Sequence, residues 1–121
     1  MRRPPPGFDN RRHEPMADQL SLLLERIRCL VRGAGESSRA PSMAEMEHTL
    51  TDGYARALEL DAEQHRLRAR IQHVAAGVRG EPDAGRLRTL IARLESTDGE
   101  LRELRGLLEV LRGCMEDARA C

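Results

Sequence analysis

Apolar residues recur at positions a and d of an unbroken heptad pattern along two segments of the chain. In the first segment, which has Met43 at position a, nine of the eleven a and d residues are apolar. In the second segment, which begins with Leu87 at position a, nine of ten are apolar. Glycine and proline residues between the segments predict a tight turn at residues 80–82. The pattern therefore predicts an antiparallel two-helix coiled-coil hairpin over residues 43–119.

A capping box marks the start of the first long helix. Ser42 and Glu45 are three residues apart, the spacing at which each side chain satisfies a backbone N–H of the first helical turn. Pro41 disfavours an earlier start. Because a methionine, Met43, opens the pattern, an alternative is that translation starts here, which would leave residues 1–42 outside the native product.

The residues before this helix divide into three parts. Residues 1–15 are rich in arginine and proline and predict a disordered tail. Residues 16–32 place Leu24, Ile27 and other aliphatic residues at helical spacing and predict a short amphipathic helix. Residues 33–42 hold glycine, serine and proline and predict a linker. We therefore expect an all-α fold, a hairpin with an additional N-terminal helix, completed to a bundle by oligomerisation or by a partner.

The pattern also sets an expected register between the two long helices. If the turn centres on residues 80–82, Gln64 faces Thr97, and this polar pair inside the apolar seams fixes the register. Gly53 then faces Leu108, a small residue against a large one. This register brings acidic side chains together on the flanks, whereas a slip of one heptad would pair them with arginines. We keep the first register, because flank ion pairs contribute little and the turn residues favour it.

A repeated tripeptide raises the question of a break in the second long helix. Thr51-Asp52-Gly53 recurs as Thr97-Asp98-Gly99, and Thr97 with Glu100 has the spacing of a second capping box. The heptad phase continues unaltered on both sides of this site. We therefore expect one continuous helix.

The composition is typical of long helices. Aromatic residues amount to 2% of the chain, Phe8 and Tyr54, while 33% of it is charged and the apolar residues are mostly Leu and Ala. Every cationic side chain is Arg, which we attribute to codon usage in a GC-rich genome. Net charge is zero, with a small positive excess in residues 1–42 over residues 43–121. That asymmetry does not require a nucleic-acid or membrane partner.

The sequence contains no recognisable catalytic or cofactor-binding constellation. His48, His65 and His73 fall at solvent-facing heptad positions, and no His or Cys lies within one helical turn of another, so we expect no metal site. Three cysteines without a CxxC pair favour a reducing cytosol over a disulfide framework. The longest apolar stretch is interrupted by charges and cannot span a bilayer. We therefore expect a cytoplasmic protein that is not an enzyme and has no cofactor.

Apolar residues remain on both flanks of the hairpin once its seams are assigned. Exposed stripes of this kind mark further helix packing. We expect the N-terminal helix to cover one flank, and a second subunit in a homodimer or a partner helix to cover the other. The expected interaction residues are Tyr54 and Leu58 on one flank, Leu107, Val110 and Cys114 on the other, and Leu24 and Ile27 on the N-terminal helix.

The main functional hypothesis is a protein–protein interaction module, acting as an adaptor, regulatory subunit or assembly scaffold. The alternative is a small helical secretion or export chaperone, which would bind a client helix and expose its apolar flanks when alone. With Glu81 and Asp83 at its tip, the hairpin resembles, in architecture only, transcription factors that reach into the RNA polymerase secondary channel. A last and less favoured alternative is binding of nucleic acid or an anionic membrane surface by the basic tail.

The heptad pattern predicts that the two long helices fold without the N-terminal part. Residues 40–121 should give a strongly helical circular dichroism spectrum and a cooperative thermal transition, because the a and d seams lie entirely within them. A mostly disordered spectrum, at concentrations where the full chain folds, would refute an autonomous hairpin.

Overall fold

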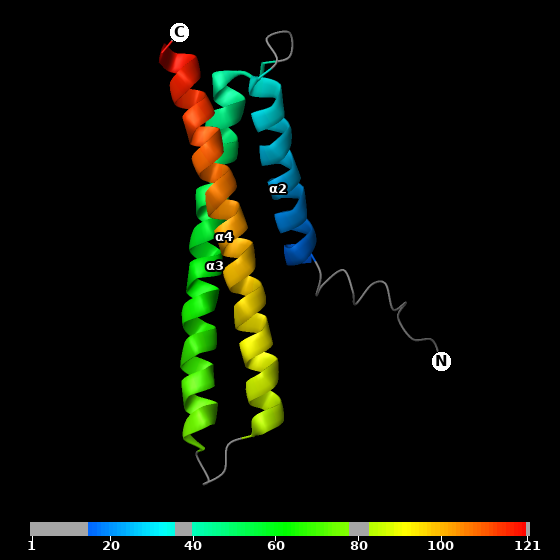
Figure 1. Cartoon of the computed structure of the whole chain (residues 1–121), viewed down its shortest axis with the longest axis vertical. Coiled ribbons are helices and arrows are strands. Elements are labelled where there is room, and N and C mark those ends of the chain that lie inside the picture. The colour runs from blue at the N-terminus through cyan, green and yellow to red at the C-terminus, as the bar shows by residue number, and fades with distance from the viewer. Residues whose placement is uncertain (1–14, 36–39, 78–82, 121) are drawn as a thin grey trace, which may run out of the picture.

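The computed structural model describes residues 15–35, 40–77 and 83–120, with side chains from residue 19 onward in the first range. The described residues form three helices and no strand. Helix α3 runs antiparallel to α2 and α4, and all three pack side by side (Figure 1). The fold is therefore all-helical and packs as a bundle. Its helices are α2 (Pro15–Ala34), α3 (Met43–Ala76) and α4 (Ala84–Ala120).

The predicted capping box at the start of α3 is confirmed. The Ser42 hydroxyl accepts a hydrogen bond of 3.0 Å from the backbone N–H of Glu45, and the Glu45 carboxylate accepts one of 3.0 Å from the backbone N–H of Ser42. Two N–H groups that the first helical turn leaves without a backbone partner are thereby satisfied. The expected tail lies largely outside the described residues, and so does the expected turn at residues 80–82.

Gly77, one of the glycines expected there, and Asp83 define the ends of α3 and α4 at the turn between them. Gly77, with φ 64° and ψ 76°, caps α3 in the left-handed conformation and donates its N–H to the carbonyl of Val74 at 3.1 Å. Helix α4 begins at Ala84, where the Asp83 carboxylate accepts a 3.1 Å hydrogen bond from the backbone N–H of Arg86. Asp83 thus acts as an N-cap. This role of Asp83 was not expected from the sequence, in which it stands beside Glu81 at an acidic tip.

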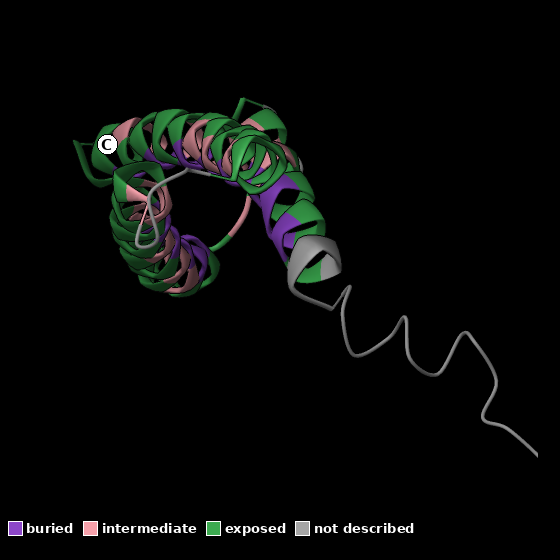
Figure 2. Ribbon diagram, turned by 90° about the horizontal axis from the view of Figure 1, so that it is seen from below, coloured by how far each residue is buried: buried purple, intermediate pink, exposed green. Residues whose placement is uncertain are grey.

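The core lies between the three helices and is centred on the leucines of α4. Figure 2 looks along the bundle and shows the buried residues on the inward sides of the helices. Four α4 leucines at a and d positions are at most 2% exposed, and Ile27 of α2 is fully buried beside them. The α4 leucines are Leu101, Leu104, Leu108 and Leu111, and the α3 residues that face the same core include Met46, Leu50, Ala57 and Leu60.

The expected continuity of the second long helix is confirmed. Helix α4 passes through Thr97-Asp98-Gly99 without interruption, and Thr97 is buried at 8% exposure. The repeated tripeptide is therefore not a helix boundary. Burial of the apolar seam on both sides of this site outweighs the weak helix propensity of its residues.

A close approach between α3 and α4 occurs at Gly53. A Cβ atom on Gly53 would lie 2.3 Å from Cδ2 of Leu108 and 3.2 Å from its Cγ. Leu108 is 1% exposed, so surrounding atoms hold it in place. Only glycine leaves room for this leucine, as the expected facing of these two residues requires.

Alanine substitutions should have opposite effects on stability at Gly53 and at the glycines on the outer side of α4. Gly53→Ala should destabilise the chain by about 0.5–2 kcal/mol, because overpacking exceeds the gain in helix propensity. Gly106→Ala is the matched control: no atom lies within 4 Å of its Cβ position, as also at Gly99 and Gly113. That change should stabilise by about 0.5–1 kcal/mol. Urea unfolding monitored by circular dichroism measures the change in the free energy of unfolding for each variant. Equal changes in the two variants would contradict the packing at Gly53.

Candidate interaction surface

Helix α2 covers one flank of the α3–α4 pair. Its Leu24 and Ile27, expected as interaction residues, are 7% and 0% exposed and pack into the chain's own core. On α4, Leu107 packs against that core and Cys114 is half-buried, whereas Val110 is 49% exposed. The flank that carries these three α4 residues is therefore the one that α2 occupies, with Val110 at its outer edge.

Polar contacts hold α2 in place around its apolar side. Arg26 donates to the Asp52 carboxylate at 2.7 Å and to the Thr49 hydroxyl at 3.2 Å, both on α3. Arg28 forms an ion pair with Glu103 of α4. Two arginines only two residues apart on α2 therefore contact different helices, and they fix the rotation of α2 about its axis.

The Asp52 carboxylate has a pKa that is displaced from its ordinary value. The hydrogen bond from Arg26 lowers the pKa of Asp52 below its ordinary value of 3.8, partial desolvation opposes this, and His48, whose Nε2 lies 3.6 Å away, adds to the lowering. A lowered carboxylate pKa means that the folded state favours the ionised form. The contact between α2 and α3 thus depends on this charge.

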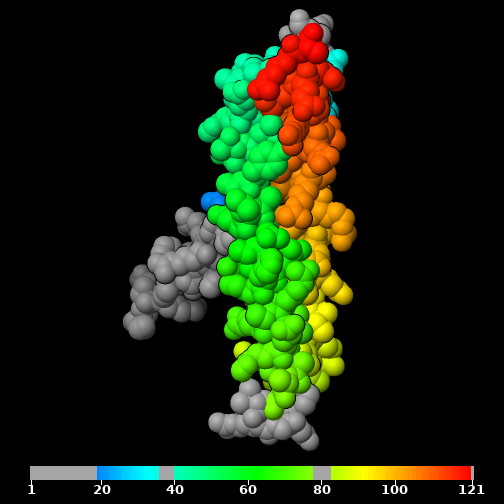
Figure 3. All heavy atoms as spheres, turned by 90° about the vertical axis from the view of Figure 1, so that its left-hand side faces the viewer, coloured from blue at the N-terminus to red at the C-terminus, as the bar shows by residue number. Residues whose placement is uncertain are grey.

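The opposite side of the α3–α4 pair is left uncovered by α2. Figure 3 views the molecule from this side, with α3 and α4 next to each other. Tyr54 is 43% exposed and Leu58 is 71% exposed on α3. One turn apart along the helix, they form a continuous apolar area. We call this side of the pair the open face.

Ion pairs across the open face link α3 to α4 above and below the apolar residues. Glu47 pairs with Arg119 at 3.0 Å, Asp61 with Arg105 at 3.7 Å, and Arg68 with Asp98 at 3.9 Å. On α3 these residues share one heptad position, and Tyr54 occupies it between Glu47 and Asp61. An aromatic residue thus replaces a charge in the middle of a charged row.

These pairs account for the acidic side chains that the expected register brought together. Asp61 is paired with an arginine of α4, and Asp98 with an arginine of α3. On the other flank, Glu63 contacts Arg93 at 3.3 Å and Arg66 at 2.8 Å. The arginine side chains are long enough to reach acidic residues one helical turn away. Opposite charges on α3 and α4 therefore attract one another, although the register places acidic residues close together.

The expected partner of Gln64 differs in the structure. Its side-chain amide donates to the carboxylate of Asp98, the residue after Thr97. Gln64 is half-buried and Asp98 lies at the edge of the open face, so the amide reaches out of the seam toward a charge. A charged acceptor forms a stronger hydrogen bond than a hydroxyl, which explains the preference for Asp98.

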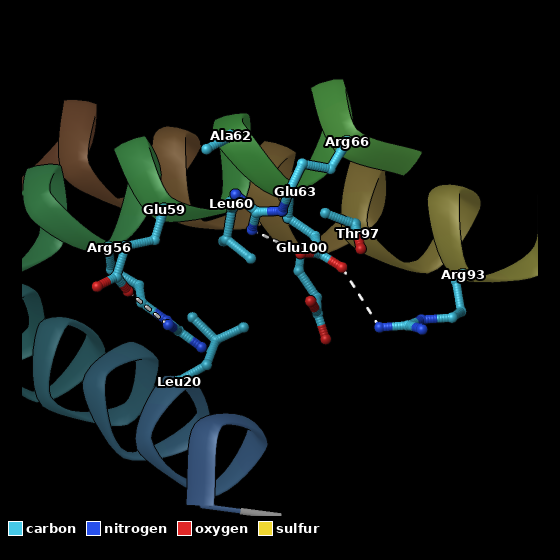
Figure 4. Close-up of a pocket in the computed structure, with 10 residues that line it drawn as sticks. All are labelled: Leu20, Arg56, Glu59, Leu60, Ala62, Glu63, Arg66, Arg93, Thr97 and Glu100. Atoms are coloured by element: carbon cyan, nitrogen blue, oxygen red, sulfur yellow. Dashed lines mark hydrogen bonds and ion pairs between the residues drawn. The ribbon is translucent and has the colours of Figure 1, made fainter. Parts of the chain in front are cut away.

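A groove of about 580 Å³ extends beyond the first buried turn of α2. Figure 4 shows Leu20 of α2 at one side, and Glu63 and Arg93 joined across the groove. Thr97 and Glu100 also line it. Arginine and glutamate side chains line it in equal number, so the groove offers no concentrated charge to a ligand.

Two general features of the described residues complete the surface. They contain no group of three or more His, Cys, Asp or Glu side chains placed to hold a metal ion. Among them, no helix combines the length and the apolar character needed to cross a membrane.

Comparisons with known proteins identify no relative. Neither a protein-family model, nor a curated protein, nor a solved structure matches this chain.

One feature of α3 was missed from the sequence. Its outer surface carries four exposed alanines at seven-residue intervals, beside Leu58. The signal was available, because this spacing is the one that identified the core seams. The four residues are Ala55, Ala62, Ala69 and Ala76.

The displaced pKa of Asp52 predicts a specific pH dependence. Because the folded-state pKa is lowered, the charge contributes stability above the ordinary pKa of 3.8, and this contribution is lost as pH falls through the lowered value. Asp52→Asn should therefore lower the melting temperature at about pH 6 and have a smaller effect at about pH 2.5. In an Arg26→Gln background the same substitution should have little effect at either pH. An equal loss at both pH values would exclude this contact as the cause.

Proposed function

We propose that this chain is a non-enzymatic protein–protein interaction module. In it, α3 and α4 form an antiparallel coiled-coil hairpin, α2 closes one flank, and a partner protein binds the open face. The observation that carries the proposal is the exposure of Tyr54 and Leu58 at 43% and 71% on a face that α2 leaves uncovered. Apolar side chains of this size, adjacent on a helix, mark a contact surface more often than isolated ones do.

Energetic estimates support a role for Leu58 and Tyr54 in binding rather than in folding. A leucine at 71% exposure contributes little to the core, whereas its complete burial in a complex would contribute about 1.5–3 kcal/mol. Tyr54 adds an amphipathic ring, the type of residue enriched at interface centres. The charged pairs at both ends of the apolar area, Glu47–Arg119 and Asp61–Arg105, supply the polar rim of such a surface.

A chaperone for an exported client is the second candidate. The same exposure favours it, because a client-binding chaperone presents its apolar surface before the client arrives. The two candidates differ in the state of the partner: a scaffold or adaptor binds a folded protein, and a chaperone binds an unfolded or helical segment. Binding of the isolated client peptide as tightly as of the folded protein would identify the chaperone.

The proposal predicts that one substitution on the open face weakens partner binding. Proteins retained from the native cell extract by the immobilised full chain are identified by mass spectrometry, and each is then purified and titrated calorimetrically. Leu58→Glu should weaken binding at least about ten-fold, because it removes more than about 1.4 kcal/mol of apolar burial. Val110→Glu is the matched control, since Val110 is also exposed, at 49%, but lies beside α2. It should leave the affinity unchanged.

Two outcomes would contradict the proposal. In one, Leu58→Glu and Val110→Glu weaken every partner equally, which would exclude the open face as the binding site. In the other, no purified protein, including the chain itself, binds at micromolar concentration.

A further inference from the structure

We propose that the partner on the open face is a second copy of this chain, docked through α3 against α3 in antiparallel orientation. This rests on the proposed function and names its partner. The contact would be centred midway between Leu58 and Ala62 and related by a two-fold axis, so that each copy contributes the same residues.

The apolar side of α3 has the form that a helix partner requires. Leu58 is 71% exposed, and the exposed Ala55 and Ala62 lie three residues before and four residues after it, on the same side of the helix. Tyr54 borders this row toward α4. Alanines beside a protruding leucine allow two helix axes to approach within the usual distance of about 8–10 Å, with each leucine inserted between alanines of the other copy.

The distribution of charge along α3 selects a second copy and its direction. Residues 43–62 contain five acidic residues, one arginine and one histidine, whereas residues 63–76 contain three arginines, two histidines and one glutamate. One half of α3 is therefore acidic and the other basic. Antiparallel packing places the acidic half of each copy against the basic half of the other, and parallel packing would place like charges together. The helix is complementary to itself only when reversed.

Individual positions agree with this arrangement. If Leu58 faces Ala62 of the second copy, Asp52 comes level with the second copy's Arg68, and Glu47 level with its His73. These side chains are exposed or half-buried at the edges of the row. Their existing partners, such as Arg26 for Asp52, remain in place, so the contact would extend networks already formed.

The α4 helix supports the same polarity. Residues 84–97 contain three arginines and one glutamate, whereas residues 98–120 contain six acidic residues and four arginines. The end of the pair near Ala76 and Ala84 is thus positive, and the end near Met43 and Ala120 is negative. The α3–α4 pairs of two copies therefore attract each other when they lie antiparallel, and this attraction should weaken with added salt.

The first test is the oligomeric state of the full chain. Sedimentation equilibrium should show a monomer–dimer equilibrium whose Kd rises at least about ten-fold in Leu58→Glu, since each dimer buries two copies of Leu58. Val110→Glu should dimerise like the wild type. A monomer at millimolar concentration, or a dimer unaffected by Leu58→Glu, would overturn the proposal.

The second test fixes the direction. In a chain whose three cysteines are replaced by serine, single cysteines replace the exposed Ala62 or Ala76, and a short bismaleimide is added. Ala62→Cys should crosslink to its counterpart, whereas Ala76→Cys should not, because at 1.5 Å per residue the two Ala76 positions would lie ~48 Å apart. Efficient crosslinking at Ala76 would show parallel packing and refute the antiparallel contact.

The two tests separate this inference from the function it rests on. A monomeric chain that binds another purified protein through Leu58 would overturn the self-association and leave the interaction module standing. A chain that neither dimerises nor binds any protein through Leu58 would overturn both.

Discussion

The whole structure depends on the burial of one row of leucines on α4. Two helices packed together cover each other's facing sides but leave the flanks of their seam partly in water. Here α2 places Ile27 and its neighbours over one flank, and the α4 leucines beneath it reach 0–2% exposure. Helix α2 therefore converts the contact between α3 and α4 into a closed core, and it does so on one side of the pair only.

The consequence is a molecule with two unlike sides and two unlike halves. α2 has 20 residues, against 34 in α3 and 37 in α4, so it accompanies only the part of the pair nearest Met43. Toward Ala76 the seam consists of two helices alone, and Ile71, Leu87 and Leu94 are half-buried there. Stability is concentrated where three helices meet, and the remaining length depends on contacts between two helices alone.

Much of the fold could be predicted from the sequence, because heptad spacing encodes the relation between neighbours on a helix and needs no knowledge of distant contacts. The capping box, the continuity of α4 and the facing of Gly53 and Leu108 follow from such local or symmetric patterns. The bonding of Gln64 to Asp98 could not be foreseen, since it depends on how far a side chain reaches across the pair. Which flank α2 would occupy was also open, because both flanks carry apolar residues and the choice depends on contacts such as Arg26–Asp52.

The glycines on the outer side of α4 have a consequence for how the molecule forms. Gly99, Gly106 and Gly113 each lower intrinsic helix stability by about 1 kcal/mol relative to alanine, although the space at each Cβ position is open. As a free peptide, α4 would therefore be largely unstructured. Its helicity comes from its neighbours, so the longest helix of the molecule should fold only as its leucines are buried. Secondary structure and core formation in α4 are then a single cooperative event.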